Sequence, residues 1–73
     1  MIKIYTAKGC PACAAAKYKL KKLGVNYVEI DVDESPEEFE ELVKKTGVAA
    51  VPIICNEKKC VVGSDKVEEV VKR

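Results

Sequence analysis

Segments in which apolar and polar residues alternate mark two of the predicted strands of this chain. Ile2–Thr6 alternates in this way, and Gly9 then breaks the pattern. A second alternating segment, Val25–Val32, places Val28 and Ile30 on the same face as Val32. We expect both segments to be strands, and the second to be half-buried through that face.

The first of two longer segments with helical spacing follows a Cys-Pro dipeptide. Pro11 suits the first position of a helix because its missing N–H would have no partner there, and Gly24 is a good stop. The predicted helix therefore covers residues 11–23. Its buried stripe consists of Cys13, Ala16, Leu20 and Leu23.

The second helical segment begins at Ser35-Pro36-Glu37-Glu38, which has the form of a capping box. In that motif Ser35 is the N-cap, and the side chain of Glu38 reaches back to the amide of Ser35. Gly47 suits the left-handed position that ends a helix. The predicted inward stripe consists of Phe39, Leu42 and Val43.

The last two strands form a predicted hairpin. An apolar run, Val48–Ile54, is interrupted by Pro52 and mirrored by Cys60–Val62 across the polar residues 56–59. With Glu57 and Lys58 as the turn, Cys55 lies directly opposite Cys60 on the same face of the sheet.

A short helix completes the chain, with Ser64 as its expected N-cap. Val67, Val70 and Val71 form its predicted inward face. The element order is β-α-β-α-β-β-α, which predicts parallel pairing in the first half and a terminal antiparallel hairpin. The 73 residues leave room for one small domain, residues 1–73.

Composition and charge narrow the function classes. The chain is 48% hydrophobic, as expected of a folded domain, and its net charge of +1 lacks the basic excess of a nucleic-acid-binding module. No apolar run is long enough for a membrane span, and no secretory signal precedes the first strand. We therefore expect a cytoplasmic monomer that binds neither nucleic acid nor membrane. The basic first helix, which includes Lys17, and the acidic residues from Glu29 to Glu41 are interpreted as solvated faces.

Cysteine is the residue type with the most chemistry to offer, because histidine is absent and the chain has four cysteines. Cys10 precedes the first helix, where unpaired N–H groups and the helix dipole favour a thiolate. Cys13 lies one turn later on the inward stripe, so we expect it to be less exposed and less ionised. This arrangement indicates a redox dithiol in which Cys10 attacks and Cys13 resolves the mixed disulfide. Lys8 adds a positive charge nearby.

Two other interpretations of the cysteines stay open. Cys-Pro-x-Cys also occurs in metal knuckles, so Cys10 alone or all four thiols could ligate a metal ion or an iron–sulfur cluster. Against this, three alanines follow Cys13 where a knuckle of the rubredoxin type has glycine. The other alternative is an inert bridge between Cys10 and Cys13, but so small a loop stabilises little.

Three blocks of this sequence resemble the glutaredoxins. They are Ile4-Tyr5-Thr6 followed by Cys10-Pro11-Ala12-Cys13, then Ala50-Val51-Pro52, and then Val62-Gly63-Ser64-Asp65. The resemblance covers essentially the whole chain. It implies an α/β thioredoxin-like fold, βαβαββα, with a central four-stranded mixed sheet, a cis bond before Pro52, and dithiol–disulfide exchange as the activity.

The resemblance also implies ligands and partners. Val51 and Pro52 would pair with an extended peptide or with glutathione, and Ser64 and Asp65 would hold the γ-glutamyl end of glutathione. Lys8 completes the set of expected substrate-binding residues. No cofactor is bound; the external reductant is glutathione or a flavoenzyme of the thioredoxin-reductase type. The expected substrates are proteins with disulfides, ribonucleotide reductase among them.

The family pattern supplies no role for Cys55 and Cys60. In a reduced cytosol they can be two small apolar residues of a hairpin. Their predicted positions opposite each other also allow a second disulfide on oxidation.

Overall fold

The computed structural model describes residues 1–71. Its elements are β1 (Ile2–Thr6), α1 (Pro11–Lys22), β2 (Tyr27–Asp31), α2 (Pro36–Thr46), β3 (Ile53–Cys55), β4 (Cys60–Val62), a 3-10 turn η1 (Ser64–Lys66) and α3 (Val67–Val71). The predicted order is thus confirmed, with the 3-10 turn as an addition before the last helix.

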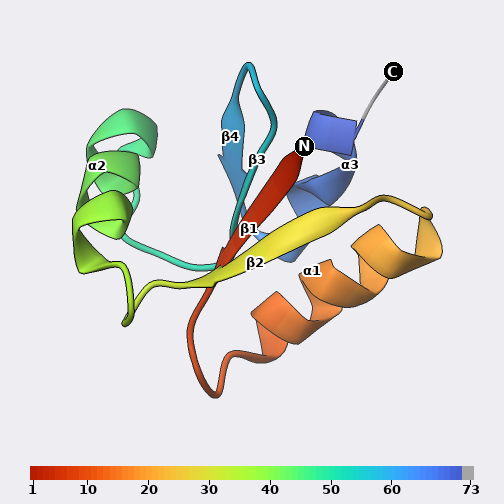
Figure 1. Cartoon of the computed structure of the whole chain (residues 1–73), viewed down its shortest axis with the longest axis horizontal. Coiled ribbons are helices and arrows are strands. Elements are labelled where there is room, and N and C mark those ends of the chain that lie inside the picture. The colour runs from red at the N-terminus through yellow and green to blue at the C-terminus, as the bar shows by residue number, and fades with distance from the viewer. Residues whose placement is uncertain (72–73) are drawn as a thin grey trace.

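The four strands form one mixed sheet in the order β2-β1-β3-β4. β1 and β2 are parallel, whereas β3 is antiparallel to both of its neighbours, β1 and β4. Figure 1 shows α2 on one side of this sheet and α1 with α3 on the other. The sheet is therefore covered on both faces, and the loop after β1 leads directly into α1.

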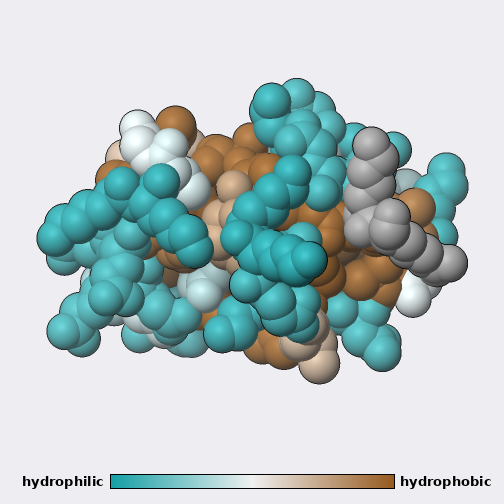
Figure 2. All heavy atoms as spheres, turned by 90° about the horizontal axis from the view of Figure 1, so that it is seen from above, coloured by the Kyte–Doolittle hydropathy of each residue, from teal (hydrophilic) through white to brown (hydrophobic). Residues whose placement is uncertain are grey.

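Each face of the sheet buries its own apolar cluster, because successive strand residues point to opposite faces. On the α1 and α3 side the fully buried members include Ile4 and Ile54 from the sheet and Leu20 from α1. On the α2 side Tyr5 and Ile53 are packed by Phe39. On the face drawn in Figure 2, hydrophobic residues lie between the hydrophilic side chains of the surface. The core is thin, as expected for a chain of this length.

Two residues expected in the interior are exposed. Val28 is 43% exposed, since it lies on the edge strand β2. Tyr27, from the opposite face of β2, packs against the core beside α1. Leu23 is 46% exposed because α1 ends before it, beside a depression that Met1 also lines.

The predicted capping box of α2 is wrong. Ser35 is the N-cap, but its side chain makes no capping hydrogen bond, and its backbone N–H donates to the carbonyl of Asp31 (3.1 Å). The carboxylate of Glu38 accepts instead from the hydroxyl of Tyr5, at 2.7 Å. Burial, and then this contact with Glu38, raises the pKa of Tyr5 to about 12. The amide of Ser35 and the carboxylate of Glu38, which the capping box would join, are therefore each bonded to another residue.

Ser64 is not the N-cap of the last helix, which begins at Val67; Ser64 is the first residue of the 3-10 turn, and Gly63 is the N-cap of that turn. Gly63 has φ 109° and ψ 146°, a conformation that residues with a Cβ rarely adopt. Its N–H donates to the carbonyl of Pro52 at 2.9 Å. This bond fixes the start of η1 against the turn that leads into β3.

We expect Gly63→Ala to lower the free energy of unfolding by about 1–3 kcal/mol, because the backbone conformation is strained for alanine. The added Cβ would also lie 2.7 Å from Oδ1 of Asp65. Gly47→Ala is the matched control: its φ is 77°, but no atom lies within 4 Å of the added Cβ. Urea unfolding measures both. A loss no larger for Gly63→Ala than for Gly47→Ala would contradict this reading of the turn.

Candidate active site

Cys10 is the N-cap of α1 and has an extended backbone, with φ −104° and ψ 104°. Its Sγ accepts a hydrogen bond from the backbone N–H of Cys13 at 3.1 Å. Pro11 occupies the first helical position and has no N–H to offer. The sulfur of Cys10 is therefore the acceptor for a helix-end amide that has no partner within the helix.

Cys13 lies one turn further along α1 and is only 2% exposed, whereas Cys10 is partly exposed. Burial, followed by hydrogen bonding to Cys10, raises the pKa of the Cys13 thiol to about 11. Neither sulfur is in a disulfide. The two thiols are thus adjacent but unequal in exposure.

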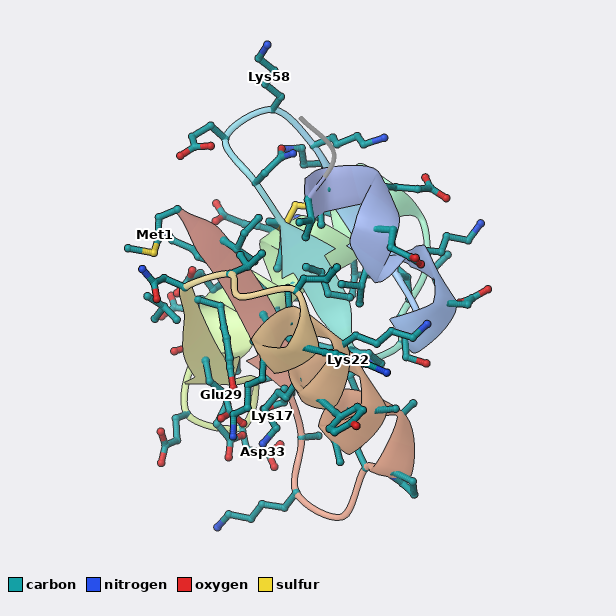
Figure 3. The ribbon with its side chains drawn as sticks, turned by 90° about the vertical axis from the view of Figure 1, so that its right-hand side faces the viewer. Met1, Lys17, Lys22, Glu29, Asp33 and Lys58 are labelled. Atoms are coloured by element: carbon teal, nitrogen blue, oxygen red, sulfur yellow. A yellow bond between two sulfur atoms is a disulfide. The ribbon has the colours of Figure 1, made fainter. Side chains whose placement is uncertain are left out.

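A small hollow beside the thiols is lined by Lys8, Cys10 and Cys13 together with a polar wall formed by Thr6, Lys17, Glu29 and Asp31. One oxygen of Glu29 accepts from the hydroxyl of Thr6 (2.9 Å) and from Nζ of Lys17 (3.1 Å). The side chains of Lys17 and Glu29 point toward each other in Figure 3. These bonds lower the pKa of Glu29, chiefly through Thr6 and then Lys17, and Glu29 in turn raises the pKa of Lys17.

The sequence pattern does not predict this wall, because Lys17 and Glu29 are typical of solvated charges in it. One signal was available: Lys17 is four residues after Cys13, which places both on one side of the helix. The position of Glu29 beside Thr6 depends on the parallel register of β1 and β2, in which Ile4 pairs with Glu29.

The other predicted substrate-binding residues do not line this hollow. The Val51–Pro52 bond is cis, as the family resemblance implies. Val51 packs in the apolar cluster that also contains Ala7 from the loop before Cys10, and Pro52 is buried. In η1, the carbonyl of Ser64 accepts from Nζ of Lys19 (3.1 Å), and Asp65 is exposed. These residues form a second group next to the Gly63 turn.

A single site made of all four thiols does not form. Cys55 and Cys60 are bonded to each other in the hairpin, away from the start of α1. Within residues 1–71, no three His, Cys, Asp or Glu side chains gather closely enough to hold a metal ion. In the same part of the chain, no helix has the length and apolar character needed to cross a membrane.

A four-stranded mixed sheet with three helices and a Cys-x-x-Cys pair at the start of the first helix defines a protein of thioredoxin-like fold. The NrdH-redoxin of Escherichia coli, described as a glutaredoxin-like protein with a thioredoxin-like activity profile, has a similar structure. The TM-score is 0.82 at 28% identity, over 94% of this chain and 92% of that one. The predicted fold class is confirmed.

The glutaredoxin family model matches residues 2–61, so this chain belongs to the glutaredoxin family. It is 34% identical over 68 residues to an uncharacterised glutaredoxin-like 8.6 kDa protein in the rubredoxin operon of Clostridium pasteurianum, covering 93% of this chain and 91% of that protein. It is 38% identical over 53 residues to glutaredoxin 3 of Escherichia coli, covering 73% of this chain and 64% of that relative. The chain thus matches less than two thirds of glutaredoxin 3. Membership assigns it to the thiol–disulfide oxidoreductases.

In the reduced protein, we expect iodoacetamide to label Cys10 between pH 6 and 9 while Cys13 stays unlabelled. The pKa of Cys13 is raised from an ordinary value of 9.0 to about 11 in the fold. The buried thiol of Cys13 therefore stays neutral and unreactive over this pH range. The neutral form contributes to the free energy of unfolding in full below pH 9, and this contribution is lost as the pH rises toward 11. Peptide mass spectrometry measures the labelling, with Cys13→Ser as the control that identifies the Cys10 peptide. Faster labelling of Cys13 would reverse the order of the two thiols.

Proposed function

We propose that this protein is a dithiol disulfide reductase in which Cys10 is the nucleophile and Cys13 the resolving thiol. The observation that carries this proposal is the unequal placement of the two sulfurs at one helix start. Cys10 is partly exposed at the N-terminus of α1, and Cys13 is buried with a raised pKa. An attacking thiol has to reach its substrate, whereas a resolving thiol has to reach only its neighbour.

The cycle balances in two exchange steps. The thiolate of Cys10 attacks one sulfur of a substrate disulfide, the substrate S–S bond breaks, and the released substrate thiolate takes up a proton. Cys13 then loses its proton and attacks Sγ of Cys10, which releases the second substrate thiol and leaves a Cys10–Cys13 disulfide. An external reductant returns two electrons and two protons to the pair. No bound cofactor takes part.

The polar wall assists the second step. Two contacts lower the pKa of Cys13 against the dominant effect of burial: a hydrogen bond with the backbone of Ala7 and, to a smaller extent, the ammonium group of Lys17. Glu29 holds Lys17 in place through the 3.1 Å ion pair, and Thr6 holds Glu29. A cation on the same side of α1 therefore stabilises the Cys13 thiolate at the moment when it attacks Cys10.

For the reductant, we infer that a flavoenzyme of the thioredoxin-reductase type serves better than glutathione. Asp65 is exposed at the start of η1, where the family pattern places a residue that holds glutathione. Ala50 and Val62, however, stand where that pattern has threonine and glycine. The thioredoxin-like activity profile of the related NrdH-redoxin supports the same preference. Proteins with disulfides, ribonucleotide reductase among them, are the proposed substrates.

We expect Cys10→Ser to abolish disulfide reduction, because the attacking sulfur is lost. Cys13→Ser should instead accumulate a mixed disulfide between Cys10 and the substrate. Insulin reduction measures turnover, and non-reducing mass spectrometry detects the adduct. Retention of most of the turnover by Cys10→Ser would contradict the assignment.

We expect glutathione-dependent turnover to be measurable but poor, and Asp65→Ala to weaken it about tenfold, as loss of one charged contact does. Glu68→Ala, which removes another exposed carboxylate of the same region, is the control. The readout is NADPH oxidation coupled through glutathione reductase. Efficient turnover that is unaffected by Asp65→Ala would show that glutathione does not bind at this residue.

A further inference from the structure

Cys55 and Cys60 form a second sulfur pair that the proposed cycle does not use. They are direct partners in the β3–β4 register, and their Cα atoms are 4.0 Å apart. The structure joins them in a disulfide, which Figure 3 shows as a yellow bond in the sheet. The pairing expected from the two-residue turn is therefore present.

This pair lies at the end of the sheet opposite to Cys10. Cys55 pairs with Lys3 near the start of β1, whereas Cys10 follows the end of β1. Figure 1 accordingly shows the β3–β4 turn and the loop before α1 at opposite ends of the molecule. The two pairs of one chain cannot meet, so any exchange between them takes place between two molecules.

Other interactions hold the hairpin without help from the disulfide. The backbone N–H of Asn56 donates to the carbonyl of Lys59 (2.9 Å), and Oδ1 of Asn56 accepts from the N–H of Lys58 and of Lys59. Its Nδ2 donates to the carbonyl of Val70 in α3 at 3.0 Å. Ile53 and Ile54 anchor β3 in the two clusters of the core.

The bridge is one of several interactions that hold the hairpin. It closes a loop with a sequence separation of only 5, and so short a loop restricts the unfolded chain less than a long loop does. The hydrogen bonds of Asn56 and the burial of Ile53 and Ile54 remain when the bridge opens, so we expect the hairpin to stay in place.

The two sulfurs differ in access. Cys55 is only 6% exposed, in the central strand β3, while Cys60 is partly exposed in β4, at the edge of the sheet. Lys58 extends from the tip of the hairpin into solvent (Figure 3), and Lys59 is also exposed. An incoming thiolate therefore reaches Cys60 first.

We propose that Cys55–Cys60 is a second thiol–disulfide exchange site, which accepts electrons from dithiols, including the Cys10–Cys13 dithiol of a second copy. That choice of donor rests on the proposed function. The donor thiolate attacks Sγ of Cys60, the bond to Cys55 breaks, and the Cys55 thiolate takes up a proton. The second donor thiol loses its proton, attacks the mixed disulfide and releases Cys60, so that the donor leaves as a disulfide. A fully reduced chain then carries two dithiols and can donate four electrons rather than two.

The first experiment uses the full chain with Cys10→Ser and Cys13→Ser, which leaves only the second pair. The oxidised protein is incubated with excess dithiothreitol without denaturant, quenched with acid and freed of dithiothreitol, and its thiols are then alkylated in denaturant and located by peptide mass spectrometry. Circular dichroism follows the fold during the reduction. We expect two newly alkylated thiols per chain and an unchanged fold. Cys55→Ser in the same background is the control and gives one alkylated thiol before and after reduction. A bridge that opens only in denaturant, or one that never forms in air, would overturn the proposal.

The second experiment tests the donor. The Cys55→Ser, Cys60→Ser variant, reduced and freed of reductant, is mixed with the oxidised acceptor. We expect two thiols to appear at Cys55 and Cys60 for every two lost at Cys10 and Cys13. A donor that reduces 5,5′-dithiobis(2-nitrobenzoic acid) but not the acceptor would overturn exchange between copies and leave the proposed function intact. A donor that reduces neither would overturn the proposed function, whereas the dithiothreitol experiment would still decide whether the second site exchanges.

Discussion

The packing of α1 on the sheet is the constraint on which the site depends. Ala16 and Leu20 of this helix are completely buried against the cluster that contains Ile4. Their burial fixes the rotation of α1 about its axis, and the 3.6-residue period then directs Cys13 toward the interior as well. Cys10, at the N-cap, lies at the tip of the helix. A small residue at position 16 allows the helix to lie close to the sheet.

This packing gives two cysteine side chains of the same chemistry different exposure and different surroundings. Burial raises the pKa of Cys13, while Cys10 accepts a backbone hydrogen bond and stays accessible. The wall of Thr6, Glu29 and Lys17 connects the end of β1, β2 and α1 beside the same thiols. The first pair opens to solvent at the start of α1, beside the hollow that this wall lines. The second pair lies at the far end, where an edge strand gives access.

Local patterns were sufficient for most of the fold. The glycine after β1, Pro11 and the helical stripe predicted α1 within one residue, and a two-residue turn determined the register that places Cys55 opposite Cys60. Contacts between distant residues were not predictable in this way. The carboxylate of Glu38 accepts a hydrogen bond from Tyr5, which is 33 residues away, so the predicted capping box does not form. The exposure of Val28 depends on the position of β2 at the sheet edge.

The candidate site, like the fold, is predictable from the sequence only where it depends on local patterns. The thiol pair is visible in the sequence because its spacing and its helix are local, whereas the ion pair of Lys17 and Glu29 depends on how α1 packs beside β2. The roles of Lys8, Val51, Pro52, Ser64 and Asp65 in binding remain predictions from the family resemblance.

The central claim is that the placement of the two sulfurs fixes the order of attack. It is tested most directly by acid quenching of the unaltered reduced protein within milliseconds of mixing with a disulfide peptide, followed by mapping of the transient adduct. The account predicts that the peptide is attached to Cys10 and that this adduct disappears as the Cys10–Cys13 disulfide forms. A first adduct on Cys13 would contradict it.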